Sequence, residues 1–205
     1  MTEPGRRHNG GWTGLTRRRF IGHASIGGAL IAASTRFGPM LATAAPGEDD
    51  VSILNYVLTL ERLEADFYSR GVEAGAVQGK ALALVEPILK HEEDHVASIS
   101  DLIEEFGGEL EDDSFDYPSG IFDSEDRFLE AALELEELGV GAYHGQLKKI
   151  SERRTLETLV AIAAIESRHA SALAALQNAD SLPAPLERGR PRSAVLKQAQ
   201  PFLGA

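Results

Sequence analysis

The chain of 205 residues contains no cysteine. This absence excludes disulfides, zinc–thiolate sites, iron–sulfur clusters and a lipoprotein anchor on a cysteine. A metal ion can therefore be held only by carboxylate and imidazole groups, which suit iron, manganese or zinc better than copper(I). A chain of this length fits a single folded domain with appendages.

Positive charge is scarce outside the N-terminal region. Residues 1–44 carry six arginines against one acidic residue, a net charge of +5. Removing this +5 from the net −12 of the whole chain leaves −17 for residues 45–205. Binding to a nucleic-acid backbone requires clustered lysine and arginine on the folded part, so nucleic acid is not an expected partner.

The N-terminal region also lacks a hydrophobic run long enough to span a membrane. Its apolar stretch, 21–33, is short and rich in glycine, and we expect no membrane span in the mature chain. The stretch follows Thr16-Arg17-Arg18-Arg19-Phe20-Ile21, which resembles a twin-arginine export signal, and precedes a small-residue cleavage site at Ala42-Thr43-Ala44. Residues 1–44 are therefore predicted to be a signal peptide bound by the twin-arginine export machinery. The mature protein would then be periplasmic or extracellular. The alternative to a signal peptide is that residues 1–44 form a disordered basic tail.

Four segments carry apolar residues at helical spacing: 51–70, 80–106, 124–150 and 155–177. Pro87 lies inside the second segment, where it should kink the helix or mark its true start. The acidic, turn-rich link 107–123 reaches about 55 Å when extended, more than the roughly 35–40 Å length of these helices. The chain can thus travel the length of the bundle before the third helix begins. We predict an all-α domain over residues 45–178, a four-helix bundle with one long crossover, which is the ferritin-like arrangement.

Residues 179–205 differ from the helical segments in composition. They contain Pro183, Pro185, Gly189 and Pro191, followed by a short apolar segment that ends at Phe202 and Leu203. We predict a C-terminal tail that wraps the bundle and contains about one helical turn.

One pattern occurs twice along the helical segments. A glutamate is followed by a tyrosine seven residues later and then by a Glu-x-x-His motif. The first copy is Glu61, Tyr68, Glu92 and His95, and the second copy is Glu136, Tyr143, Glu166 and His169. The two spacings between glutamates, 31 and 30 residues, also agree.

The glutamates and histidines of this pattern lie within the apolar stripes of their helices. Burying an unpaired carboxylate costs several kcal/mol, while the stability of a whole domain is only about 5–15 kcal/mol. Two divalent cations would balance the four carboxylates, and each Glu-x-x-His pair can approach one metal because residues i and i+3 share a helix face. One glutamate from each of two helices and a Glu-x-x-His from each of the others is the ligand set of di-iron and di-manganese bundles. We therefore predict a site for two divalent ions, iron or manganese.

Four motifs resemble those of the ferritin-like superfamily over about residues 50–178: Leu60-Glu61-Arg62-Leu63-Glu64-Ala65-Asp66-Phe67-Tyr68, Glu92-Glu93-Asp94-His95, Leu135-Glu136-Glu137-Leu138-Gly139-Val140-Gly141-Ala142-Tyr143 and Glu166-Ser167-Arg168-His169. The closest resemblance is to exported ferritin-like domain proteins related to rubrerythrin and bacterioferritin. It implies that Glu92 and Glu166 bridge the metals. The resemblance also implies that Glu61 and Glu136 are terminal ligands and that His95 and His169 bind one metal each. By the same resemblance, the hydroxyls of Tyr68 and Tyr143 orient carboxylate ligands.

The chain departs from rubrerythrins in two respects. Without cysteine it cannot hold their cysteine-ligated electron-transfer iron. Their additional glutamate on the third helix would fall at Gly139, and the pseudo-symmetric position on the first helix is Glu64, which is a candidate seventh ligand. Gly139 and Gly141 should leave space beside the site for oxygen, peroxide or water to enter.

The predicted function is oxidoreductase chemistry on O2 or peroxide, or oxidation of Fe(II), in the manner of a ferroxidase, peroxidase or catalase. The alternatives are a non-catalytic metal-binding or stress-protection protein, or an iron store that assembles into a cage. The run from His91 to His95 also fits the His-Glu-x-x-His pattern of zinc proteases, but that function leaves the second copy of the repeat unexplained. The sequence leaves open whether the protein is catalytic and whether it forms a homo-oligomer.

Overall fold

The structure, a computed structural model, describes residues 48–182 and 184–204. Its four long helices are α1 (Glu48–Glu73), α2 (Gly79–Glu105), α3 (Glu125–Gln146) and α4 (Arg153–Leu176). The 3-10 turn η2 (Leu147–Lys149) follows α3, and the helix α5 (Arg192–Ala199) continues into η3 (Gln200–Phe202). The predicted all-α fold is confirmed, and within these residues the only β pairing is an isolated bridge between Phe115 and Leu203. The predicted signal peptide, 1–44, lies outside the described residues.

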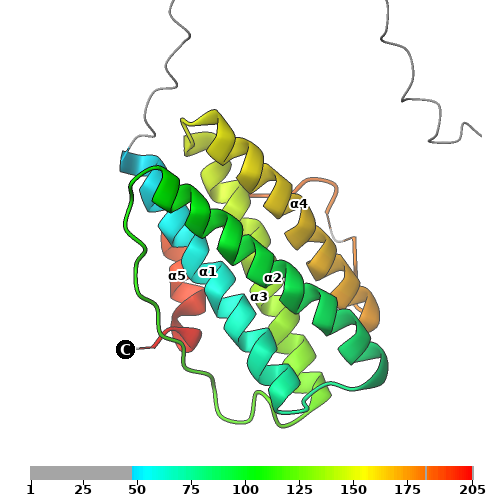
Figure 1. The fold of residues 1–205 in the computed structure, drawn as a ribbon. Helices are drawn as coiled ribbons and strands as arrows, with labels where there is room; N and C mark the ends of the chain where they lie inside the picture. The colour runs from blue at the N-terminus through cyan, green and yellow to red at the C-terminus, as the bar shows by residue number, and fades with distance from the viewer. Residues whose placement is uncertain (1–47, 183, 205) are drawn as a thin grey trace, which may run out of the picture. The chain divides into compact units, whose positions relative to one another are not determined.

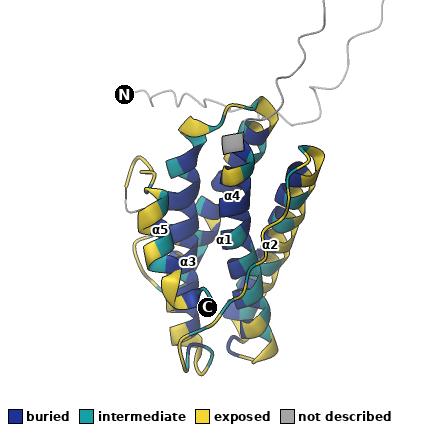
Figure 2. Ribbon diagram, turned by 90° about the vertical axis from the view of Figure 1, so that its left-hand side faces the viewer, coloured by how far each residue is buried: buried dark blue, intermediate teal, exposed yellow. Residues whose placement is uncertain are grey.

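The four long helices form two packed pairs. α1 packs chiefly on α2 and α3 chiefly on α4, while α1 also contacts α3 and α2 contacts α4 (Figure 1). α2 and α3 run in the same direction because the link between them returns along the whole bundle, as predicted (Figure 1). The inward faces of the helices are buried and the outward faces are exposed (Figure 2).

Side-chain hydrogen bonds hold the long crossover on one stripe of α1. In order along α1, the contacts are Asn55 with the backbone of Glu109 and Glu111, Thr59 and Arg62 with the carboxylate of Asp113, and Asp66 with the hydroxyl of Tyr117. Positions 55, 59, 62 and 66 share a face at helical spacing. Because the crossover occupies this face, the opposite face of α1, which carries Glu61, points into the bundle.

Local hydrogen bonds determine where the helices begin and end. Asp50 accepts from the backbone N–H of Ser151 and Glu152, at 3.0 and 2.7 Å, and the Glu152 carboxylate accepts from the N–H of Thr155 at 2.6 Å. The Glu152 contact satisfies one free N–H group in the first turn of α4, which begins at Arg153, and the Asp50 contacts hold the chain just before it. Pro87 lies inside α2 and does not mark its start, since α2 begins at Gly79.

The interior consists of two apolar clusters, one toward each end of the bundle. The first includes Leu54, Leu58 and Ile99 and reaches Val195 of α5. The second contains an aromatic group in which the rings of Phe67 and Phe128 stack with centroids 4.7 Å apart and planes inclined by 5°. The helical turns between the two clusters carry buried polar residues.

The C-terminal segment is more ordered than predicted, with an eight-residue helix and a 3-10 turn in place of about one helical turn. α5 packs on α3 and buries Val195 and Ala199 completely. Just before it, the N–H of Arg190 donates to the carbonyl of Gly141 at 2.8 Å, and a Cβ at Gly145 would stand 2.0 Å from the carbonyl oxygen of Arg190. The tail thus lies against the backbone of α3 at two glycines.

Among the described helices, α4 alone is long and apolar enough to cross a membrane when judged by length and composition. A core helix of a bundle satisfies the same two criteria. Because α4 packs on α3 and carries buried polar side chains, these criteria are weak evidence for a membrane span.

Candidate metal centre

The two copies of the sequence pattern meet between the two apolar clusters. α1 contributes Glu61, α2 contributes Glu92 and His95, α3 contributes Glu136, and α4 contributes Glu166 and His169. The four carboxylates are completely buried, and the histidines are only 8% and 5% exposed. The structure therefore brings together all six residues that the sequence predicted as ligands.

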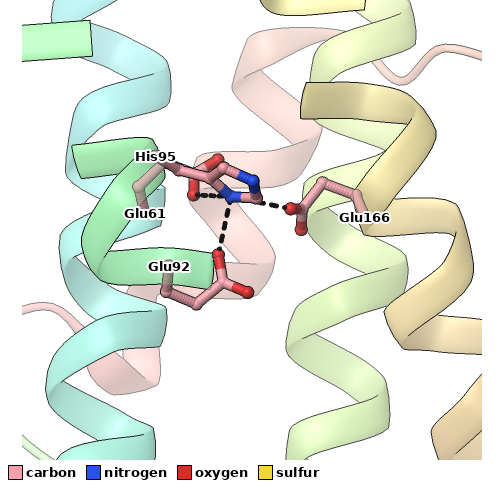
Figure 3. A group of neighbouring side chains, drawn as sticks. All are labelled: Glu61, Glu92, His95 and Glu166. Carbon is pink, nitrogen blue, oxygen red and sulfur yellow. Dashed lines mark hydrogen bonds and ion pairs between the residues drawn. The ribbon is translucent and has the colours of Figure 1, made fainter. Parts of the chain in front are cut away.

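One group of donors surrounds His95. Its Nδ1 lies 3.0 Å from Glu61 Oε2, 3.1 Å from Glu92 Oε2 and 3.2 Å from Glu166 Oε1 (Figure 3). Each of these four residues offers a ligand atom within 4.8 Å of the others. A single cation can therefore be reached by all four side chains.

A second group of donors surrounds His169. Its Nδ1 lies 3.0 Å from Glu92 Oε1, 3.4 Å from Glu136 Oε2 and 3.8 Å from Glu166 Oε1. These four residues again offer ligand atoms within 4.8 Å of one another. Glu92 and Glu166 belong to both groups, and Glu92 turns a different oxygen toward each histidine.

Two tyrosines hold the glutamates that belong to one group only. Tyr68 on α1 donates from its hydroxyl to Glu136 Oε1 on α3 at 2.5 Å, and Tyr143 on α3 donates to Glu61 Oε1 on α1. Burial first, and then the partner carboxylate, raises the pKa of each phenol well above its usual value, so both hydroxyls remain protonated donors. The second oxygen of each glutamate faces the histidine of its group.

Several buried atoms of the cluster have no hydrogen-bond partner. They are Glu64 Oε2, Glu92 Oε1, Glu136 Oε2, both carboxylate oxygens of Glu166, and His169 Nδ1. Buried polar atoms are normally paired, because an unpaired one costs about 1–3 kcal/mol. Here carboxylate and imidazole lone pairs converge without hydrogen-bond donors between them. Such a set of lone pairs suits iron, manganese or zinc. The cluster is therefore compatible with metal binding.

Protons balance the buried charge when cations are absent. Burial, followed by the neighbouring Glu166 carboxylate, raises the pKa of Glu92 to about 7. Burial opposes charging of the histidines, but hydrogen bonds to Glu166 and Glu61 outweigh it and raise the pKa of His95 to about 12. Contacts with Glu136 and Glu92 likewise outweigh burial and raise the pKa of His169 to about 10. Protons and cations therefore compete for the same groups.

Glu64 lies beside the cluster but outside both groups of donors. It is 2% exposed, and burial followed by the Glu166 carboxylate raises its pKa well above the usual value. A Cβ at Gly139 would stand 3.1 Å from Glu64 Oε1 and 3.4 Å from Glu166 Oε2. Carboxyl groups thus fill the space beside Gly139, and the side chain of Arg190 fills the space beside Gly141. Side chains therefore occupy the positions next to both glycines, and an entry route for oxygen, peroxide or water beside them stays a prediction.

Sequence reasoning considered His91 only as part of the zinc-protease pattern and missed its contact in the site. His91 Nδ1 lies 2.9 Å from Nε2 of His169. The spacing of His91 and His95, i and i+4 on α2, places both on one helix face and could have indicated that His91 lies near the cluster, although not which residue it contacts. The zinc-protease pattern requires both histidines on one metal, whereas here Glu92 belongs to both groups of donors and His91 to neither.

Comparison with known proteins gives one family match. The ferritin-like domain profile matches residues 49–179, a range that includes the four long helices almost completely and every residue of the cluster. A search of curated proteins gives no match. Since the matched range covers more than half of the chain and has the predicted four-helix topology, the chain belongs to the ferritin-like domain family.

Proposed function

We propose that the cluster binds two divalent metal ions, iron or manganese, with one ion at each histidine. The supporting observation is the pair of four-residue donor groups that share Glu92 and Glu166. Two divalent cations would balance the four carboxylates that belong to these groups. The two orientations of the Glu92 oxygens favour a bridging role for this residue. Glu61 and Glu136 suit terminal roles, because a tyrosine holds one oxygen of each.

We also propose that the centre carries out oxidoreductase chemistry on O2 or peroxide, or oxidises Fe(II). Two adjacent redox-active ions, when bound, supply or accept electrons in pairs. The chain itself contributes fixed donors and phenol hydroxyls that orient two of the carboxylates. The apolar clusters on either side keep water away from these groups, which strengthens electrostatic interactions inside the site.

Metal analysis of the full chain after anaerobic loading with Fe(II) or Mn(II) tests the binding proposal. We expect two equivalents per chain for the wild type and loss of both in the Glu92→Ala, Glu166→Ala double variant, because both groups of donors lose their shared members. Glu93→Ala is the matched control, since Glu93 is the exposed neighbour of Glu92 on α2. A wild-type protein that binds less than one equivalent would contradict the proposal.

Turnover measurements test the proposed chemistry. Loaded wild-type protein should consume peroxide or oxidise Fe(II) faster than the double variant does under the same conditions. If the wild type binds two ions but matches the double variant in both rates, the oxidoreductase proposal fails. The non-catalytic metal-binding function would then account for the site.

We also propose that residues 1–44 are a signal peptide that directs export of the protein by the twin-arginine pathway. Twin-arginine export carries folded proteins, which suits a protein that takes up its metal before crossing the membrane. Replacing both Arg17 and Arg18 by lysine should keep the protein inside the cell, as measured by fractionation. The same change at Arg6 and Arg7 is the matched control, because that pair lies outside the motif. Export of the Arg17, Arg18 variant at the wild-type level would refute the proposal.

A further inference from the structure

The two halves of the site differ in one contact. Nε2 of His169 lies 2.9 Å from Nδ1 of His91, which is the residue before Glu92. The corresponding position in the second half, before Glu166, is occupied by Ile165. Because an isoleucine side chain has no hydrogen-bonding atom, this position cannot supply His95 with an equivalent partner.

The two imidazole rings are arranged for an in-plane hydrogen bond. Their planes are inclined by 13° and their centroids are 5.2 Å apart. Each nitrogen is an atom of its own ring and so lies a fixed, short distance from the ring centroid. With the centroids 5.2 Å apart, the two nitrogens can be as close as 2.9 Å only if both lie close to the line that joins the centroids. The rings therefore meet rim to rim, which is the direction in which an imidazole N–H donates.

The other nitrogen of His169 faces the cluster. His169 Nδ1 lies 3.0 Å from Glu92 Oε1, is buried, and has no hydrogen-bond partner. A neutral imidazole carries its proton on one nitrogen and a lone pair on the other. If Nδ1 offers its lone pair to a metal, the proton of His169 is on Nε2, and Nδ1 of His91 is the acceptor at hydrogen-bond distance.

We propose that His91 is a positioning residue for His169: it accepts the Nε2 proton, fixes the tautomer whose Nδ1 can bind a metal, and holds the ring in place. This inference rests on the proposed two-metal site. It makes the two metal positions unequal, because the position at His169 depends on His91 and the position at His95 does not. Histidine ligands normally donate their second N–H to a fixed acceptor, and loss of that acceptor typically lowers metal affinity by about 10–100-fold.

His91→Leu and His91→Asn form a matched pair for the test. Leucine and asparagine have nearly the same shape, but only asparagine carries an oxygen acceptor near the place of the histidine Nδ1. Because His91 is exposed, we expect both variants to fold, which circular dichroism checks. Ile165→Leu, at the corresponding position of the second half, controls for packing changes.

The metal-free full chain is titrated anaerobically with Mn(II) by calorimetry and with Co(II) by visible absorption. His91→Leu should weaken one of the two binding events by about 10–100-fold and leave the other unchanged. His91→Asn should keep most of the wild-type affinity, and Ile165→Leu should keep both events.

Nitrogen-15 NMR of the zinc-loaded protein gives a readout independent of affinity. It should show His169 protonated at Nε2, with slower proton exchange in the wild type and His91→Asn than in His91→Leu. Unchanged binding in His91→Leu, or an equal loss in His91→Asn, would overturn the role of His91 while leaving the two-metal proposal intact. A wild type that binds none of these ions would overturn both.

Discussion

At the scale of single residues, the hydroxyls of two tyrosines determine how two carboxylates present themselves to the histidines. Tyr143 holds one oxygen of Glu61, so that the other oxygen faces His95. Tyr68 does the same for Glu136 and His169. Without its tyrosine, a glutamate could rotate about its last bond, and the donor geometry would no longer be fixed.

Tyr143→Phe should therefore lower metal affinity by about 10–100-fold without unfolding the protein, because the ring stays in its apolar surroundings and only the hydroxyl is lost. Metal titration, together with thermal unfolding of the metal-free variant, measures both effects. Tyr56→Phe is the matched control, since the Tyr56 hydroxyl is buried without a partner. If Tyr143→Phe binds metal as tightly as the wild type, the hydroxyl has no part in the site.

The sequence was sufficient to find the six residues of the cluster but not their individual contacts. Spacing and position in an apolar stripe specify the helix face, which is why the Glu-x-x-His pairs were predicted to point inward. The pairing of Tyr68 with Glu136 depends on α1 lying beside α3, and the contact of His91 with His169 depends on α2 lying beside α4. Spacing along one helix carries no information about which helix is its neighbour.

Glu64→Gln tests the remaining candidate ligand. Glutamine resembles the protonated acid in shape and charge, and burial favours that neutral form of Glu64. Because Glu64 lies outside both groups of donors, the variant should still bind two metal ions and unfold at the wild-type temperature when metal-free. Glu61→Gln, which removes a charge from a donor group, should weaken metal binding. Loss of one equivalent in Glu64→Gln would instead make Glu64 a seventh ligand.

At the scale of the elements, the long helices were predictable and the small one was not. The predicted segment 51–70 is three residues short at each end of α1, because the flanking residues are acidic or glycine except for Val72 and so do not continue the apolar period. α5 buries only Val195 and Ala199, too few residues to give a period. Its place depends instead on the close approach of the preceding chain to glycines of α3, a contact that appears only in three dimensions.

Gly145→Ala should destabilise the protein, although alanine favours a helix over glycine by about 1 kcal/mol. The new Cβ would stand 2.0 Å from the carbonyl oxygen of Arg190, and backbone cannot move aside as a flexible side chain can. We expect a loss of about 1–3 kcal/mol in the free energy of unfolding, measured by denaturant titration. Limited proteolysis should also cut faster between residues 179 and 191. An unchanged or higher stability would contradict the close packing of this segment on α3.

At the scale of the whole molecule, a layer of buried acids separates two apolar clusters, and the stability of the bundle depends on what neutralises that layer. Five glutamates lie there at 2% exposure or less: Glu61, Glu64, Glu92, Glu136 and Glu166. Uncompensated buried charges are costly, so the folded state must bind protons or cations. Metal binding displaces protons from these groups and therefore strengthens as pH rises.

The metal-free protein should lose stability as pH rises from about 5 to about 8. Glu92 faces Glu61, Glu166, His95 and His169; burial and then Glu166 raise its pKa from 4.5 to about 7. The folded state binds this proton more tightly than the unfolded state, so its stabilisation is complete below pH 4.5 and is lost as pH rises through about 7. The raised pKa of His169 adds a loss in the same direction between pH 6.5 and about 10.

Scanning calorimetry with a chelator, and again with excess Mn(II), measures this dependence. The rise in unfolding temperature caused by Mn(II) should be larger at pH 8 than at pH 5, since protons compete less with the cation at the higher pH. Glu92→Gln is the control: without metal, it should lose part of the pH dependence between 4.5 and 7, because its amide does not titrate. A metal-free unfolding temperature that climbs steadily over this range would show that the unfolded state binds more protons than the folded state, and it would contradict protonation of the buried acids in the fold.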